Sequence, residues 1–247
     1  ALYVVEKDAR FRRRKGRLYR SESGLTLNMI LTRNLQKVRD DVKNCGREVT
    51  LIAASKTQPK EVVDEFMTIA PDFVLGENRV QELLEKYDSR YRWHFIGRLQ
   101  TNKVKYIVDK VELIHSLDRD DLAKEIEKQA AKHGKIMDCL VEINMGAEIS
   151  KGGVSPENAL AFIQSMKVYP HIRIKGVMTV LPNLDKDEQQ LGALCDKLRG
   201  IFEQAKLIKQ DNVDIEYLSC GMSADYQIAL AHGSNMIRLG RMLFGER

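Results

Sequence analysis

The chain has 247 residues, enough for one large domain or two small ones. Hydrophobic residues make up 43% and charged residues 30%, which is typical of a globular protein with a substantial core. No run approaches the roughly 18 consecutive apolar residues of a membrane helix, so we expect no membrane-spanning segment. The four cysteines are scattered and form no C-x-x-C pair, which argues against a zinc ribbon or a disulfide framework and favours a reduced, cytoplasmic compartment.

The net charge of +5 is concentrated in one short segment. Residues 1–24 carry eight Lys or Arg and three acids, whereas the rest of the chain carries 32 basic and 32 acidic residues. The body of the protein therefore has no basic bias, and we expect no nucleic-acid partner for it.

Residues 1–28 allow three interpretations. The run R-F-R-R-R-K-G-R could neutralise phosphates as a nucleic-acid-binding arm. A mitochondrial transit peptide fits poorly, because three acids interrupt the basic residues. The third interpretation, which we favour, is an appended expression leader, since the sequence begins with Ala and Met29 opens a helical pattern. We therefore expect the folded domain to span residues 29–247 and to begin with a helix.

From residue 49 onward, apolar or β-branched runs alternate with segments of helical periodicity. The runs lie at residues 49–54, 72–75, 93–96, 112–115, 138–144, 173–178, 215–219 and 236–239, and helical segments include 60–69, 80–87, 120–133, 157–168 and 186–209. Eight such units without a linker predict an α/β fold, a single (β/α)8 TIM barrel, with an open doubly wound sheet as the alternative. Polar or glycine residues follow most of the runs, which favours loops converging on one site of a barrel.

Lys56 ends the first predicted strand, V-T-L-I-A-A-S-K. A lysine at this place is either a solvated strand end or an amine held in an apolar barrel mouth. In the second case desolvation would favour the neutral amine, which is the nucleophile that forms a Schiff base.

Two segments near the C-terminus indicate a phosphate site. In S-C-G-M-S-A-D (residues 219–225), a glycine turn precedes Ser223 at a predicted N-cap, with Asp225 in the first turn of the following helix. In I-R-L-G-R (residues 237–241), Gly240 would let the backbone approach a ligand. Loops after strands 7 and 8 are where barrels commonly bind phosphate, although an ordinary capped helix would give the same pattern.

Arg238 shares the inner face of the last predicted strand with Met236 and Gly240. A buried guanidinium needs a partner, either a carboxylate from another strand or a ligand atom such as a ring nitrogen or an anion. Among the histidines, His94 is interpreted as a core residue, and His115 as a lining or capping residue. No spaced His, Cys or acidic cluster predicts a metal site, and neither a P-loop nor a dinucleotide fingerprint is present.

Taken together, the motifs resemble those of the pyridoxal phosphate homeostasis proteins. The matching segments are A-S-K-T-Q-P (54–59), G-E-N-R-V-Q-E (76–82), W-H-F-I-G-R-L-Q-T-N-K (93–103), K-G-V-M-T (175–179), S-C-G-M-S-A-D (219–225) and I-R-L-G (237–240). Six motifs in order, spread from about residue 29 to 247, make the resemblance specific. It implies a barrel similar to the N-terminal domain of alanine racemase that binds pyridoxal 5′-phosphate (PLP).

The resemblance also implies a role for each matching residue. Lys56 would hold PLP as a Schiff base, and Arg238 would face the pyridine nitrogen. The phosphate would be held by Ser219, Ser223, Gly240 and the backbone of Met222 and Arg241, while Asn78 and Met178 would line the ring pocket with His94 nearby. The family usually has Thr or Ser where this chain has Arg241, so we expect only the backbone of Arg241 to contribute.

We expect a PLP carrier or regulator without turnover. A guanidinium at the ring nitrogen cannot accept a proton there, which leaves the ring a poor electron sink. Racemases of this barrel type take a second base from a further domain and a second subunit, and the sequence here ends eight residues after Leu239. We therefore expect a monomer whose partners are PLP and PLP-dependent apoenzymes; a PLP-dependent racemase or lyase is the alternative.

Overall fold

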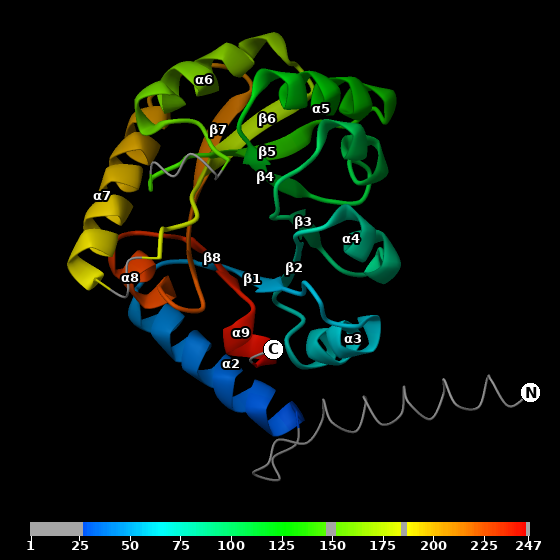
Figure 1. The fold of residues 1–247 in the computed structure, drawn as a ribbon, viewed down its shortest axis with the longest axis vertical. Helices are drawn as coiled ribbons and strands as arrows, with labels where there is room; N and C mark the ends of the chain where they lie inside the picture. The colour runs from blue at the N-terminus through cyan, green and yellow to red at the C-terminus, as the bar shows by residue number, and fades with distance from the viewer. Residues whose placement is uncertain (1–26, 147–151, 184–186, 246–247) are drawn as a thin grey trace, which may run out of the picture.

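The computed structural model describes residues 27–146, 152–183 and 187–245, and these form a closed barrel of eight parallel strands (Figure 1). The strands follow one another around the barrel in chain order, and the last pairs with the first. They are β1 Thr50–Ala54, β2 Val74–Glu77, β3 Trp93–Phe95, β4 Leu113–Leu117, β5 Met137–Glu142, β6 Ile172–Met178, β7 Val213–Met222 and β8 Met236–Leu239. Each overlaps a predicted run, so the (β/α)8 prediction is confirmed over the open sheet.

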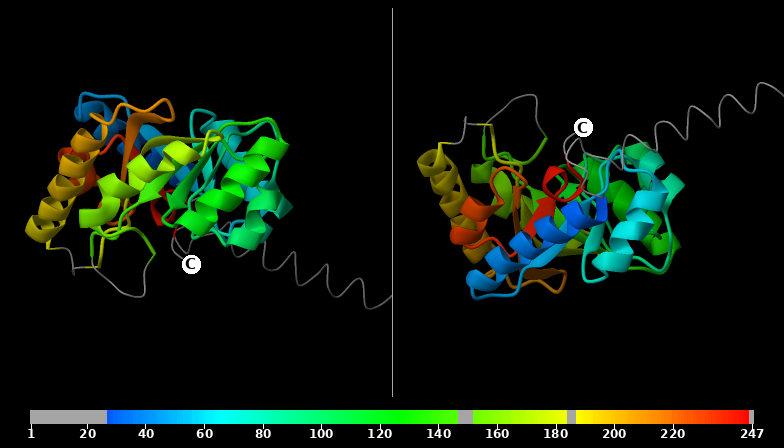
Figure 2. Two further views of the ribbon diagram at one scale, coloured as in Figure 1. Left: turned by 90° about the horizontal axis from the view of Figure 1, so that it is seen from above. Right: turned by 90° about the horizontal axis from the view of Figure 1, so that it is seen from below.

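Helices surround the barrel on its outer side, as the views from above and below show (Figure 2). They are α2 Leu27–Asn44, α3 Lys60–Ile69, α4 Val80–Lys86, α5 Asp120–Lys132, α6 Ala159–Ser165, α7 Glu188–Ala205, α8 Tyr226–Ala231 and α9 Arg241–Phe244, with 3-10 turns η1 Thr101–Tyr106, η2 Pro156–Asn158 and η3 Met166–Val168. The connection from β3 to β4 contains η1 in place of an α-helix. None of the described helices is both long and apolar enough to cross a bilayer.

The N-terminal helix α2 packs beside α8 and α9 (Figure 1). Leu31, Leu35 and Val38 are buried, and their helical spacing places them on one face. The Tyr226 hydroxyl donates a hydrogen bond to Asp41 Oδ2 at 2.6 Å and ties α8 to α2. The helix begins two residues before the expected Met29. The basic leader expected at residues 1–28 otherwise lies outside the described residues.

The strands separate two apolar cores because successive side chains point to opposite faces of a strand. One core fills the barrel and consists of Ile52, Val74, Leu113, Leu140, Met178 and Met236. The other, much larger core lies between the outer faces of the strands and the helices. The barrel interior also contains buried polar side chains, among them His94, Ser219 and Arg238, and the candidate site lies next to these residues.

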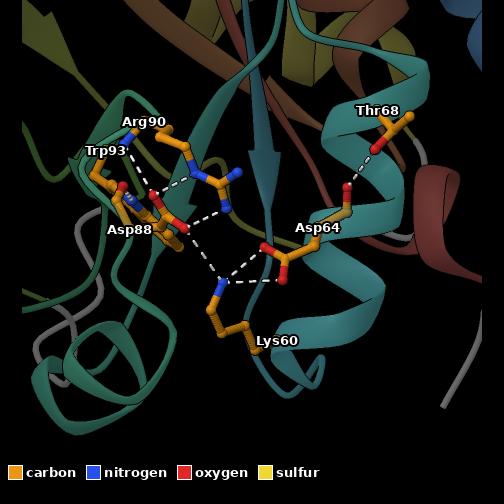
Figure 3. Close-up of polar contacts among 6 residues, drawn as sticks. All are labelled: Lys60, Asp64, Thr68, Asp88, Arg90 and Trp93. Carbon is orange, nitrogen blue, oxygen red and sulfur yellow. Dashed lines mark hydrogen bonds and ion pairs between the residues drawn. The ribbon is translucent and has the colours of Figure 1, made fainter.

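A polar network ties α3 to the loop between α4 and β3 (Figure 3). Lys60 Nζ lies 2.8 Å from Asp64 Oδ1 and 3.6 Å from Asp88 Oδ2. The Arg90 guanidinium hydrogen-bonds to Asp88 and lowers the pKa of that carboxyl, while Trp93 Nε1 donates to the Asp88 carbonyl at 3.1 Å. The charged side chains of this network are partly exposed, so their ion pairs orient the loop more than they stabilise the fold.

Two histidines meet inside the barrel. His94 Nδ1 and His115 Nε2 lie 3.0 Å apart, and both rings are buried. Burial lowers the pKa of His94 to about 3, and burial, reinforced by His94 and Arg238, also lowers the pKa of His115. Both rings are therefore neutral near neutral pH, and one nitrogen donates to the other. This agrees with the interpretation of His94 as a core histidine.

The variant His94→Asn should flatten the acid dependence of stability. Between pH 6.5 and about 3 the unfolded histidine is protonated and the folded one is not, so stability falls as the pH falls through this window. One such group contributes a slope of about 1.4 kcal/mol per pH unit. Urea unfolding across this window should show the wild type losing more stability than the variant by that slope. Equal losses would show that folded His94 takes up protons normally.

Candidate functional site

A pocket of about 570 Å³ opens at the carboxyl ends of the strands. Its described lining comes from residues of β1, β7 and β8 and from the connections that follow β1, β2, β3, β6, β7 and β8. Seven of the ten residues predicted for the site line it: Lys56, Asn78, Met222, Ser223, Arg238, Gly240 and Arg241. Residues that are up to about 185 positions apart in the sequence therefore share one cavity, as the closed barrel requires.

The other three predicted residues lie outside this lining. His94 and Met178 each stand two residues before a lining residue of the same strand face, Ile96 and Val180 respectively. Ser219 is fully buried and contacts Arg238. These three side chains therefore form the layer on which the pocket rests.

Lys56 follows the end of β1 by two residues and is half-buried. Its side chain lines the pocket together with Ala54, the last residue of β1, and with Gln58 from the same connection. Of the two sequence interpretations, a solvated strand end or an amine in the barrel mouth, the geometry supports the second.

Arg238 is a buried cation at the inner end of the pocket, with 4% of its surface exposed. Its Nη1 donates to Ser219 Oγ at 2.7 Å, and its Nη2 donates to the Thr179 carbonyl at 2.8 Å. The hydrogen-bond partners that the described part of the chain gives it are neutral. Burial lowers its pKa, yet a guanidinium remains protonated in proteins. The charge therefore remains available to a ligand in the pocket.

Ser223 does not cap the helix for which the sequence predicted it. The N-cap of α8 is Asp225, and that helix begins at Tyr226. Instead, Ser223 Oγ accepts hydrogen bonds from the backbone N–H groups of Gly240 at 3.2 Å and Met242 at 3.1 Å. The prediction failed because the hydroxyl serves the first turn of α9, on the neighbouring connection, instead of its own chain neighbours. The two loops predicted to bind phosphate are thus directly joined.

The loop after β7 is shaped by a glycine and an acid. Gly221 has φ +103°, and a Cβ there would lie 2.8 Å from Ala229 Cβ, so the position requires glycine. Asp225 Oδ1 accepts from the Met222 N–H at 2.5 Å, and burial raises the pKa of that carboxyl. The resulting turn presents Met222 and Ser223 to the pocket.

Sequence reasoning missed several lining residues and one unusual acid. Ile96, Val180 and Phe244 supply apolar lining, and strand alternation beyond His94 and Met178 could have indicated the first two. Glu142 ends β5, and burial, reinforced by nearby Asp118, raises its pKa to about 7. An acid at the end of an apolar strand was the available signal.

The charge of the pocket is one-sided. Within residues 27–146, 152–183 and 187–245, the lining contains Lys56, Arg238 and Arg241 and no acid. No group of three or more His, Cys, Asp or Glu side chains in these ranges is placed to hold a metal ion. Three cations, glycine backbone and apolar side chains suit an anionic ligand with an apolar body.

The fold and this pocket define the class of the chain. Residues 30–247 match the family described as "Alanine racemase, N-terminal domain". An alanine racemase of Clostridium difficile 630 has the same fold, with a TM-score of 0.65 at 16% identity, and the match covers 87% of this chain and 57% of that one.

Closer relatives define the family within that class. A protein of Aquifex aeolicus (strain VF5) named "Pyridoxal phosphate homeostasis protein" is 44% identical over 224 residues, covering 88% of this chain and 96% of the relative. A Helicobacter pylori protein of the same name is 34% identical over 204 residues, covering 80% and 88%. The structure of PipY from Synechococcus elongatus PCC7942 with PLP bound matches with a TM-score of 0.73 and 27% identity, covering 87% and 100%. The chain belongs to the pyridoxal phosphate homeostasis protein family.

Proposed function

We propose that this protein binds PLP in the pocket at the strand ends and holds it as a Schiff base on Lys56, without turnover of its own. The observation that carries the proposal is that one cavity brings together Lys56, Arg238 and the Ser223–Gly240 contact between two loops. The name of the Aquifex aeolicus relative and the description of PipY as PLP-bound support the same ligand.

The chemistry of the pocket fits PLP. The cofactor supplies an aldehyde that a primary amine converts into a Schiff base with loss of one water, and Lys56 is the only amine among the described lining residues. A phosphate dianion suits a lining with three cations and no acid. At Gly240 a Cβ would meet the Ala54 carbonyl oxygen at 3.4 Å, an ordinary contact. The packing therefore tolerates a side chain there, and a bound phosphate explains why none is present.

The family resemblance suggests roles for the remaining residues, and their positions are compatible with most of them. Ser223, Gly240 and the backbone of Met222 and Arg241 would hold the phosphate, and Asn78 would line the ring pocket. Ser219 would act through Arg238, because its hydroxyl accepts from that guanidinium. Met178 and His94 would support the ring pocket from the layer beneath.

The absence of turnover is proposed from the donors that the pocket offers. A guanidinium at the ring nitrogen donates a hydrogen bond but cannot accept a proton, so it keeps that nitrogen unprotonated and weakens electron withdrawal. The described lining contains no His, Tyr, Cys, Asp or Glu that could act as a second base. Such a site binds a reactive aldehyde and shields it.

We further propose that the protein is a monomer that transfers PLP to apoenzymes in the cytoplasm. Four free cysteines, three of them buried, support a reducing compartment. Schiff-base formation is reversible, which suits a carrier that must release its ligand.

Gly240→Ala should weaken PLP binding by about 10- to 100-fold, because a methyl group would displace the phosphate from one charge-assisted hydrogen bond of about 1.5–3 kcal/mol. Titration by absorbance would measure the affinity. Pyridoxal, which lacks the phosphate, should bind the wild type and the variant equally weakly. Gly200→Ala, on α7 with open space around it, is the control and should leave binding unchanged. Equal affinity of the wild type for PLP and pyridoxal would refute the phosphate site.

Turnover is tested by α-proton exchange. With PLP-loaded protein in D₂O, the α-proton NMR signal of each amino acid should decay no faster than with the same concentration of free PLP, because the pocket lacks a second base. An alanine racemase serves as the positive control. Faster exchange of any amino acid would establish the alternative, a PLP-dependent racemase or lyase.

A further inference from the structure

The residues on both sides of Lys56 are held by side chains that none of the predicted site residues provide. Ser55 precedes Lys56 and is fully buried, and Thr57 follows it. Both are bound by groups from the end of β2 and from α4. The loop that carries Lys56 is therefore held by side-chain contacts at the residue before it and at the residue after it.

Ser55 is held by a buried ion pair between Glu77 and Lys86, whose exposed fractions are 0% and 4%. Lys86 Nζ also donates to the Ser55 carbonyl at 2.9 Å, and the Ser55 hydroxyl donates to Glu77 Oε1 at 2.9 Å. The second carboxylate oxygen, Glu77 Oε2, accepts from the Asn78 N–H at 2.9 Å. One carboxylate thus sets the backbone of a lining residue and the approach to Lys56.

A second contact, from α4, holds Thr57. Its N–H donates to Glu82 Oε2 at 2.6 Å, and its φ of +66° lies in the left-handed region that a β-branched residue avoids. Such a backbone persists where its surroundings hold it in place. Farther along the same connection, Lys60 is tied to Asp88 (Figure 3), so α3 also begins from a fixed point.

A purely structural role would explain why the Glu77–Lys86 ion pair is buried, but not why the contacts converge on the residues beside Lys56. Lys86 and Glu82 lie on one face of α4, with Lys86 Nζ 3.6 Å from Glu82 Oε2, and they reach the two neighbours of a single residue. The backbone on either side of a residue fixes its Cα–Cβ direction. An amine that must attack an aldehyde carbon depends on a fixed Cα–Cβ direction, because bond formation requires a defined geometry. A side chain that only packs against its neighbours tolerates a wider range of directions.

We propose that Glu77, Glu82 and Lys86, here called the α4 clamp, are positioning residues that direct the Lys56 amine toward the aldehyde of the ligand. This inference rests on the proposed function. It assigns the clamp to the covalent bond and not to the phosphate contacts, which come from the connections after β7 and β8. The clamp should therefore affect ligands that can form a Schiff base and spare ligands that cannot.

The test compares PLP with pyridoxine 5′-phosphate, which carries an alcohol in place of the aldehyde. Glu82 is partly exposed, so Glu82→Ala should fold, and it removes the acceptor of the Thr57 N–H. Glu82→Gln keeps an oxygen acceptor. Glu85→Ala removes an exposed acid from the same helix and is the matched control.

Glu82→Ala should lower the affinity for PLP by about 10- to 100-fold, the range typical of outer-shell partners, and leave the affinity for pyridoxine 5′-phosphate unchanged. Glu82→Gln should restore most of the loss, and Glu85→Ala should bind both ligands like the wild type. An unchanged PLP affinity in Glu82→Ala, or an equal loss for both ligands, would overturn the clamp. Equal affinity of the wild type for the two ligands would instead overturn the Schiff base itself.

Discussion

The pairing of β8 with β1 is the constraint on which the site depends. In this pair Ile52 lies opposite Arg238 and Ala53 opposite Leu239, so the connections after the first and last strands leave the barrel side by side. Lys56 and Gly240 reach the same cavity for this reason. In an open sheet these strands could lie at opposite edges, and the amine would have no anion site beside it.

Barrel closure also brings apolar and polar side chains together in the interior. Apolar side chains from six strands fill part of it, and buried histidines, Arg238 and Ser219 form a polar layer. The two histidines are hydrogen-bonded to each other, and the partners of Arg238, the Ser219 hydroxyl and the Thr179 carbonyl, are neutral. The layer therefore supports a charged guanidinium under the pocket without a carboxylate ion pair in the described residues, and this leaves its charge free for a ligand.

The strands and the strand-end residues could be predicted because they depend on local patterns. Apolar runs located all eight strands, six of the predicted lining residues follow such runs, and Arg238 lies within the last one. What could not be predicted depends on contacts across elements. Ser223 follows the capping pattern of α8 but serves α9, because only the folded barrel brings Gly240 within reach. The burial of Lys86 could not be predicted either, because a lysine on a short helix is usually solvated. It is buried because it forms an ion pair with Glu77 at the end of β2.

The central claim is that Lys56 carries the ligand covalently. Its most direct test is to load the purified protein with PLP, reduce it with borohydride, and locate the pyridoxyl group by peptide mass spectrometry. We expect a visible absorption band before reduction and afterwards a single modified peptide with the label on Lys56. Label on any other lysine, or a Lys56→Ala variant that keeps the visible band, would contradict it.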